Sequence, residues 1–248
     1  MAKTKILVLI PARFDSTRFP GKPLAPILGK PMIQWVFERV SAINNPEIEC
    51  VSCVVTDNVK IKTAVEDFGG RVCLVSDHTE SGTERIALAS SRFFQDEGFD
   101  LIINVQGDEP LIEAKIIEDL AMFHIKNNFD ITTVVRPDNE IGQEENTVKA
   151  IYCPDSGRCL YFSRSEIPFD RTNSRDSFYA HVGIYSFKPA ALHQFCQFKL
   201  GYYEKIESLE QLRALENGLT IGAIEVNVRL QGVDTPDDIT KVEGKLNE

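Results

Sequence analysis

The sequence predicts an α/β fold built on a mostly parallel sheet. In the first half of the chain, a short aliphatic run is followed by an amphipathic stretch, and this pattern occurs four times. Each aliphatic run ends in a loop rich in glycine, proline or polar residues. Strands that alternate with helical patterns are typical of doubly wound parallel sheets flanked by helices. The chain has 248 residues, which suits one α/β domain with a small insertion.

The elements of the first half can be assigned in order. The expected strands, which read as short buried runs, are residues 6–10, 50–55, 72–75 and 101–105. The expected helices, whose apolar residues recur every three or four positions, are residues 32–43, 59–68, 83–94 and 112–125.

The second half has a different pattern, with short strands joined by polar links. The expected strands are residues 147–152, 160–163, 181–187 and 221–226. The expected helices are residues 190–197 and 209–217, with a last helix that begins at Pro236. The sequence therefore predicts a single domain over residues 1–248, in which about 130–215 form an inserted lobe of mixed α+β structure.

Composition restricts the partners and the location. A net charge of −10 argues against nucleic acid or a membrane surface as the main partner. The apolar run Ile6–Ile10 stops at Pro11, which is too short for a signal peptide core or a transmembrane helix. We therefore expect a cytoplasmic protein.

Three polar clusters follow the predicted strands, at the sheet edge where ligands of open α/β folds bind. The first, residues 11–22, holds Arg13, Arg18 and Lys22 within an otherwise acidic chain. Cations and backbone N–H groups are what a triphosphate needs, although a basic surface loop would look the same.

The other two clusters have equally plain alternatives. Ser81 and Gly82 could receive a nucleotide at a helix N-terminus, or Ser81 could be an ordinary N-cap. Asp108 follows a strand and a glycine, where a carboxylate can hold Mg²⁺ beside phosphates. Asp234 could be a second ligand, or Asp234 or Thr235 could be the cap of the helix that begins at Pro236. The spacing of Asp108 and Asp234 does not show whether they meet.

Together these segments resemble the 3-deoxy-manno-octulosonate cytidylyltransferases, also called CMP-Kdo synthetases, nearly from end to end. The segments are IPARFDSTRFPGKPL, GKPMIQWV, SGTERIA, NVQGDEPLI, YFSRSEIPF, HVGIYSF, ESLEQLRALENG and GVDTPDDI. The resemblance implies a nucleotidyltransferase-type fold, with a mostly parallel twisted sheet flanked by helices and a smaller mixed lobe for dimerisation. We therefore expect a homodimer.

The resemblance also implies roles for individual residues. The residues implied to bind CTP are Ala12, Arg13, Ser16, Lys22, Ser81, Gly82 and Gln106. Those implied to line the sugar-acid pocket are Gln106, Arg164, His181, Tyr185, Glu210 and Gln211. Arg164 is the expected partner of the sugar carboxylate, because a guanidinium offers two parallel donors. Asp108 and Asp234 are implied to bind Mg²⁺, and with Arg13 and Lys22 they form the implied catalytic group.

The implied reaction is in-line attack of the sugar's anomeric hydroxyl on the α-phosphorus of CTP, with pyrophosphate leaving. We expect catalysis by positioning and charge neutralisation, without a protein base. The product, CMP-Kdo, would serve lipopolysaccharide biosynthesis. Three alternatives stay open. They are the same reaction on 8-amino-3,8-dideoxy-manno-octulosonate or a sialic acid, transfer from another nucleoside triphosphate, and a nucleotide-sensing module without activity.

Overall fold

A computed structural model describes residues 3–15, 19–228 and 230–247 of the chain. Contacts divide it into two compact units. The first unit comprises Met1–Glu118 and Leu230–Glu248, and the second comprises Asp119–Arg229, a range that contains the predicted lobe. Within the described ranges, no helix combines the length and the apolar character needed to cross a membrane.

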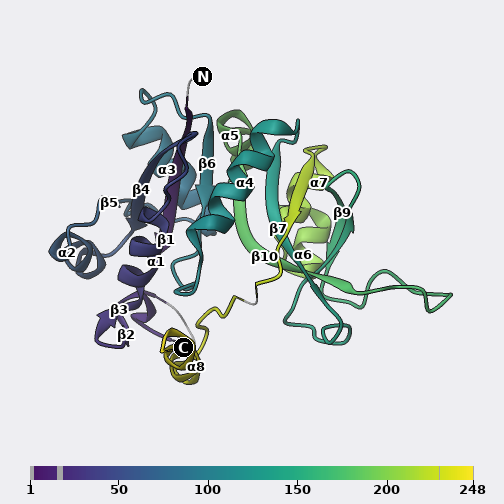
Figure 1. The fold of residues 1–248 in the computed structure, drawn as a ribbon. Coiled ribbons are helices and arrows are strands. Elements are labelled where there is room, and N and C mark those ends of the chain that lie inside the picture. The colour runs from purple at the N-terminus through teal and green to yellow at the C-terminus, as the bar shows by residue number, and fades with distance from the viewer. Residues whose placement is uncertain (1–2, 16–18, 229, 248) are drawn as a thin grey trace. The chain divides into compact units, whose positions relative to one another are not determined.

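The first unit is built on four parallel strands in the order β5-β4-β1-β6 (Figure 1). Their bounds are β1 Thr4–Ala12, β4 Ile48–Thr56, β5 Val72–Leu74 and β6 Leu101–Asn104. The side chains from Ile6 to Ile10 in β1 are fully buried, as expected for a central parallel strand that is covered on both faces. The predicted parallel arrangement of the first half is confirmed.

Helices of the first unit pack against these strands. They are α1 Met32–Ser41 on β4, α2 Val59–Asp67 on β4 and β5, and α3 Gly82–Phe93 on β1 and β6. The side chains of Asn58 and Ser81 are the N-caps that set where α2 and α3 begin. The remaining elements are the 3-10 helix η1 Lys22–Leu24, the hairpin strands β2 Pro26–Ile27 and β3 Lys30–Pro31, and α8 Pro236–Leu246. Helix α4, Ala114–Lys126, begins in the first unit and ends in the second.

The second unit has five strands in the order β10-β7-β11-β9-β8, and β8 also pairs with β10. Only the β7–β11 pair is parallel. The strands are β7 Ile131–Asp138, β8 Lys149–Cys153, β9 Arg158–Ser163, β10 Phe178–Phe187 and β11 Ile221–Glu225. The helices are α5 Pro189–Gln197, α6 Tyr202–Glu207 and α7 Gln211–Glu216. The sequence analysis omitted β7 and α6.

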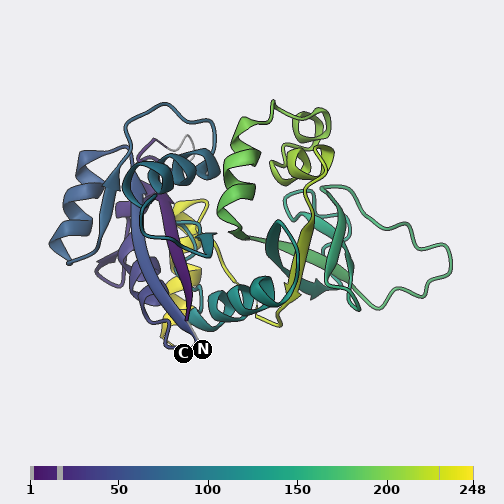
Figure 2. The ribbon, with the colours of Figure 1, turned by 90° about the horizontal axis from the view of Figure 1, so that it is seen from above.

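A segment between β9 and β10, residues 164–177, extends well beyond the strands of the second unit (Figure 2). We call this segment the arm. Asp170 organises it, since the carboxylate accepts hydrogen bonds from the backbone N–H groups of Thr172, Ser174 and Arg175. Phe169 on the arm is 88% exposed, which is unusual for a large aromatic side chain.

A buried histidine joins α4 to β10 within the second unit. Nε2 of His124 lies 3.2 Å from the carbonyl oxygen of Phe129, which can only accept a hydrogen bond. Nδ1 therefore accepts from the hydroxyl of Ser186, at 2.8 Å, and the ring is neutral. Burial lowers the pKa of His124 to about 4.

We predict that His124 makes the protein less stable as the pH falls from 6.5 to about 4. In this window the unfolded chain binds a proton that the folded state excludes, so protonation favours unfolding. The pKa difference corresponds to about 3 kcal/mol at most. Urea unfolding across pH 7.5 to 4 should show a shallower pH dependence for His124→Gln than for the wild type. The exposed His193 provides the control His193→Gln, which should keep the wild-type slope.

Candidate active site

A cavity of about 360 Å³ lies in the first unit, where the ends of β1 and β6 meet the start of α3. Residues from all three clusters singled out in the sequence line it. The lining residues are Pro11, Ala12, Arg13, Asp15, Lys22, Pro23, Gly82, Gln106, Gly107 and Asp108. The cavity therefore contains six residues implied to act in the reaction: Ala12, Arg13, Lys22, Gly82, Gln106 and Asp108.

Two glycines shape the lining of this cavity. A Cβ atom on Gly107 would lie 2.8 Å from the carbonyl oxygen of Pro11, so a larger residue would push the loops after β1 and β6 apart. Gly21 has a φ of 71°, a left-handed conformation that few other residues adopt readily. This conformation turns the chain into η1, which begins at Lys22.

Lys22 brings the two distant aspartates together. Its ammonium group donates to the carboxylate of Asp108 and, at 2.9 Å, to the carbonyl oxygen of Val233. The same ammonium lies 3.8 Å from Oδ1 of Asp234. The backbone N–H of Val233 also donates to the carbonyl oxygen of Asp108, at 2.9 Å, which joins the two segments directly. Asp108 and Asp234 therefore share one cation.

The start of α8 removes the alternative role considered for Asp234. Thr235 is the N-cap of α8, and both its hydroxyl and its backbone N–H donate to Asp238. Asp234 precedes the cap and lies instead beside Lys22.

Glu109 adds a third acidic group that the sequence analysis missed, although it follows Asp108 directly. Burial, together with the negative charges of Asp108 and Asp234, raises the pKa of Glu109 to about 8. Glu109 is therefore mostly protonated at neutral pH. The carboxylates of Asp108 and Asp234 still leave one negative charge in excess of the Lys22 ammonium, and this excess favours a further cation. Across the described part of the chain, however, no three His, Cys, Asp or Glu side chains are arranged to hold a metal ion. A metal here would need ligands beyond Asp108 and Asp234.

Arg13 adds positive charge to the lining of the cavity, and Arg85 lies nearby in helix α3. Nη2 of Arg13 is buried and has no hydrogen-bond partner among the described residues. Such a nitrogen is strongly stabilised when an acceptor reaches it, and a phosphate oxygen is suitable. Arg85 is only 3% exposed and forms an ion pair with Asp57 at 2.8 Å. The sequence analysis did not single out Arg85, because it resembles any basic residue in the first turns of a helix.

Ser81, one of the residues implied to bind CTP, is the N-cap of α3. The hydroxyl of Ser81 accepts from the backbone N–H of Glu84 at 3.1 Å, so it caps α3, while the neighbouring Gly82 lines the cavity. Contact between Ser81 and a nucleotide stays a prediction. Ser16 lies outside the described residues.

Arg164 lies in the second unit, directly after β9, and several contacts fix it. Its Nε donates to the carbonyl oxygen of Glu207 at 2.8 Å, and its Nη1 donates to that of Glu145 at 3.1 Å. The carboxylate of Glu207 accepts from the backbone N–H of Arg164 at 2.9 Å. Because Nε is already used, a sugar carboxylate would approach the two terminal nitrogens of the guanidinium.

Lys149 was also missed, although it is a single charge within an apolar strand. Its side chain is completely buried, and its ammonium donates to the carbonyl oxygens of Glu144, Thr147 and Arg164. These bonds tie the carbonyl of Arg164 to the turn that contains Glu145. Lys149 therefore holds the backbone of Arg164 directly, and it also holds the turn whose Glu145 carbonyl accepts from the guanidinium.

The other residues implied to bind the sugar acid gather around β10. His181 and Tyr185 have ring centroids 5.3 Å apart, and the register of β10 against β7 shifts between Val182 and Tyr185. Such bulges are frequent beside active sites because they redirect side chains. Burial raises the pKa of Tyr185 well above its usual range, and the charge of nearby Glu210 adds to this. Gln211 follows Glu210 at the start of α7, and its Nε2 is buried without a hydrogen-bond partner among the described residues.

His181 is neutral, and its tautomer follows from its partner. The hydroxyl of Thr133 has one proton, which it donates to the carbonyl oxygen of Ile184 at 2.7 Å. It must therefore accept from Nε2 of His181, at 3.0 Å. Nδ1 of His181 is then left as an acceptor, and burial lowers the pKa of the ring to about 4.

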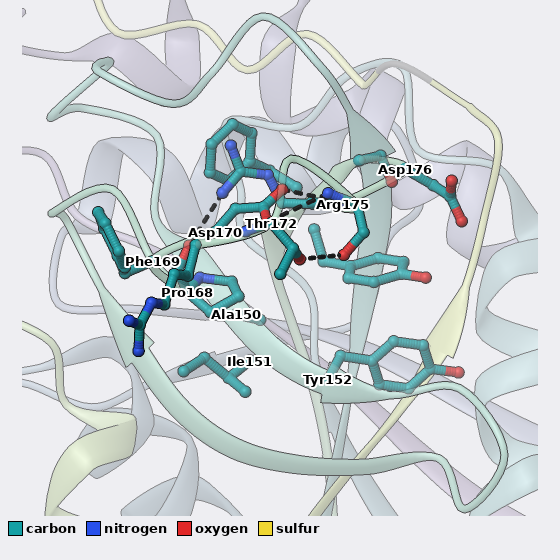
Figure 3. Close-up of a pocket in the computed structure, with 14 residues that line it drawn as sticks. Ala150, Ile151, Tyr152, Pro168, Phe169, Asp170, Thr172, Arg175 and Asp176 are labelled. Atoms are coloured by element: carbon teal, nitrogen blue, oxygen red, sulfur yellow. Dashed lines mark hydrogen bonds between the residues drawn. The ribbon is translucent and has the colours of Figure 1, made fainter.

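A larger cavity, of about 540 Å³, lies between the arm and β8 in the second unit (Figure 3). Arg175 and Asp170 of the arm lie at this cavity together with Tyr152 of β8. The guanidinium of Arg175 stacks on Phe178 at 3.6 Å and donates to the carbonyl oxygen of Pro168 at 2.9 Å. None of the residues implied to act in the reaction lines this cavity.

The fold and the cavity define a class of protein. A parallel sheet that presents an arginine, a lysine and paired carboxylates at the ends of its strands is the arrangement of a nucleotidyltransferase. A family model described as cytidylyltransferase matches residues 7–221, and the chain belongs to this family.

Individual relatives match over nearly the full length. The 8-amino-3,8-dideoxy-manno-octulosonate cytidylyltransferase of Shewanella pealeana is 42% identical over 97% of this chain and 98% of its own. The 3-deoxy-manno-octulosonate cytidylyltransferase of Photobacterium profundum is 42% identical over 95% of this chain and 96% of its own. A solved structure of a CMP:2-keto-3-deoxy-manno-octonic acid synthetase with CTP has a TM-score of 0.90 at 35% identity, and covers 98% of this chain and 99% of that one.

We predict that Lys149→Met lowers the free energy of unfolding by about 3 kcal/mol or more, because it leaves three buried carbonyl oxygens without a donor. Urea denaturation measures this change. Lys188→Met is the matched control, since Lys188 lies in the same unit and its ammonium donates to the side chain of Asn128, at 2.9 Å. A change below 1 kcal/mol for Lys149→Met would contradict the structural role given to this lysine.

Proposed function

We propose that this enzyme transfers CMP from CTP to 3-deoxy-manno-octulosonate (Kdo), giving CMP-Kdo for lipopolysaccharide biosynthesis and releasing pyrophosphate. One observation carries the proposal. The ammonium of Lys22 links Asp108 and Asp234 at a cavity in which a buried Arg13 nitrogen has no partner among the described residues. This arrangement suits a triphosphate, and it occurs in a chain 42% identical to a Kdo cytidylyltransferase.

The residues of the cavity act mainly by binding and orienting. Nη2 of Arg13 and the ammonium of Lys22 donate to phosphate oxygens, and this neutralises the charge that develops on the leaving pyrophosphate. Ala12, Ser81 and Gly82 contact the nucleotide. Ser16 contacts it as well. Gln106 contacts both the nucleotide and the sugar acid.

The second unit supplies the groups for the sugar acid. The terminal nitrogens of Arg164 bind its carboxylate. The carbonyl oxygen of Glu145 accepts from Nη1 of the guanidinium, and Lys149 holds the backbone carbonyl of Arg164. The neutral ring of His181 offers Nδ1 as an acceptor for a sugar hydroxyl. Tyr185, Glu210 and Gln211 complete the polar lining, with the buried Nε2 of Gln211 as a donor that awaits an oxygen.

Mg²⁺ is the proposed cofactor, and the residues of the first unit fit it. Asp108 and Asp234 provide hard oxygen ligands, and the surplus of acidic groups around Lys22 favours an added cation. When bound there, Mg²⁺ would neutralise phosphate charge and lower the pKa of the attacking hydroxyl. The nucleotide phosphates would provide the ligands that the protein lacks.

A second substrate, 8-amino-3,8-dideoxy-manno-octulosonate, is favoured by one specific observation. The Shewanella pealeana relative named for this amino sugar is 42% identical to the chain, as is the Photobacterium profundum relative named for Kdo. The deciding experiment measures pyrophosphate release from CTP with each sugar alone and with both in competition. Comparison of CTP with UTP, GTP and ATP tests the nucleotide. If neither sugar leads to release of pyrophosphate from CTP, the proposal is wrong.

We predict that Asp108→Asn lowers kcat/KM for pyrophosphate release by at least about a hundredfold, because it removes a charged ligand from the reacting phosphates. It should also weaken binding of Mn²⁺, used as a spectroscopic substitute for Mg²⁺ and measured by electron paramagnetic resonance. Asp96→Asn, at an exposed position of the same unit, is the control. Near-normal turnover and Mn²⁺ binding in Asp108→Asn would refute the metal site.

We also propose that the enzyme works as a homodimer in the cytoplasm, where CTP is available. The exposed Phe169 and the adjoining cavity give the arm the apolar anchor and the pocket that protein interfaces use.

We predict that Phe169→Asp turns this dimer into a monomer, because a carboxylate is poorly tolerated at the centre of an interface. Light scattering coupled to size-exclusion chromatography would show a mass near that of one 27.9 kDa chain instead of two. Phe93→Asp, at an exposed phenylalanine of the first unit, should remain a dimer. A monomeric wild type would contradict the proposed assembly.

A further inference from the structure

Arg85 is a buried cation that lies close to the cavity but does not line it. It follows Gly82, which does line the cavity, and its side chain is 3% exposed. Nη2 pairs with Asp57 at 2.8 Å, and Nη1 donates to the carbonyl oxygen of Val75 at 2.7 Å. A buried charge is strongly unfavourable unless it is paired, so these contacts hold Arg85 in place.

The register of the sheet places Arg13 beside Asp57. In the parallel pair of β1 and β4, Ala12 is the partner of Thr56, and both strands end there. Arg13 and Asp57 are the next residues on the two adjacent strands, so they leave the sheet side by side. Without Arg85, the carboxylate of Asp57 is the neighbour with which Arg13 would pair.

The structure shows that Arg13 is not used in this way. Its Nη2 is buried and has no hydrogen-bond partner among the described residues, while the carboxylate of Asp57 is bound to Arg85. Burial lowers the pKa of Arg85, and the charge of Arg13 acts in the same direction, as expected for two cations that the register of β1 and β4 brings near the same carboxylate. Asp57 thus pairs with one of the two cations, Arg85, and the positive charge of Arg13 stays available at the cavity.

We propose that Arg85 is a positioning residue of the triphosphate site, which holds Asp57 and thereby keeps the guanidinium of Arg13 unpaired for the phosphates of CTP. This inference rests on the proposed function, since it assumes that the cavity binds CTP.

The test is a double-mutant cycle on CTP binding, measured by calorimetry in the presence of Mg²⁺. In Arg85→Met, Asp57 captures Arg13, and CTP affinity should fall about tenfold, as expected for the loss of one charge-assisted contact. The affinity for CMP, which lacks the outer phosphates, should change much less. In Asp57→Asn, and in the double variant D57N/R85M, no carboxylate competes for Arg13, and CTP affinity should lie within about threefold of the wild type.

The rescue distinguishes positioning from a structural or direct role. A control variant, Arg92→Met, removes an exposed arginine of the same helix that bonds Asp77 at 2.9 Å, and it should bind CTP normally. An unchanged affinity in Arg85→Met would overturn the proposal. The proposal would also be overturned if the double variant D57N/R85M bound CTP tenfold more weakly than Asp57→Asn. This second comparison tests the positioning role even when Arg85→Met alone fails to fold. A wild type that does not bind CTP would overturn the proposed function itself.

Discussion

The contact of Lys22 with two carboxylates is the interaction on which the proposed chemistry depends. Asp108 follows β6, and Asp234 precedes α8, so the two acids come from segments that are far apart in the sequence. Their mutual repulsion is offset by the ammonium between them and by the backbone bond from Val233 to Asp108. Burial and the charges of the two aspartates raise the pKa of Glu109 to about 8, so at neutral pH Glu109 adds little negative charge. The two aspartates still outnumber the one ammonium, which suits the divalent cation proposed for this site. Arg13, which lines the same cavity, keeps a buried nitrogen without a partner among the described residues.

The two units solve different recognition problems with different structures. The first presents charged groups at the ends of parallel strands, where ligands of open α/β sheets bind. The second holds neutral polar groups in an antiparallel setting, where burial keeps His181 unprotonated and Tyr185 protonated. In the second unit, the guanidinium of Arg164 donates to the backbone carbonyl oxygens of Glu207 and Glu145. The carboxylate of Glu207 accepts instead from the backbone N–H of Arg164. The guanidinium can therefore bind an anionic substrate group without first giving up a carboxylate partner.

Much of the fold could be predicted from the sequence, because its strongest signals are local. Continuous aliphatic runs such as Ile6–Ile10 predicted the parallel strands, and Ser81 was considered as an N-cap before the structure showed it to be one. The cap at Asn58 was not predicted. Strand β7 was omitted although Ile131–Val135 is rich in β-branched residues, since nothing nearby alternates in polarity. The three loop clusters of the cavity were foreseen from strand ends. By contrast, Arg85 and Lys149 become informative only through burial and partners far away in the sequence. The meeting of Asp108 and Asp234 likewise depends on long-range packing, which spacing does not encode.

The discontinuity of the first unit has a consequence for how the molecule is made. The chain leaves this unit after residue 118 and returns to it only at residue 230. On the ribosome, the four parallel strands emerge early, whereas Val233, Asp234 and α8 emerge only after the whole second unit. The pairing of Lys22 with Asp234 therefore cannot form until the second unit has been synthesised. An incomplete chain that ends before residue 230 would keep its parallel strands but would carry only half of the acidic pair, so an unfinished product has no competent centre.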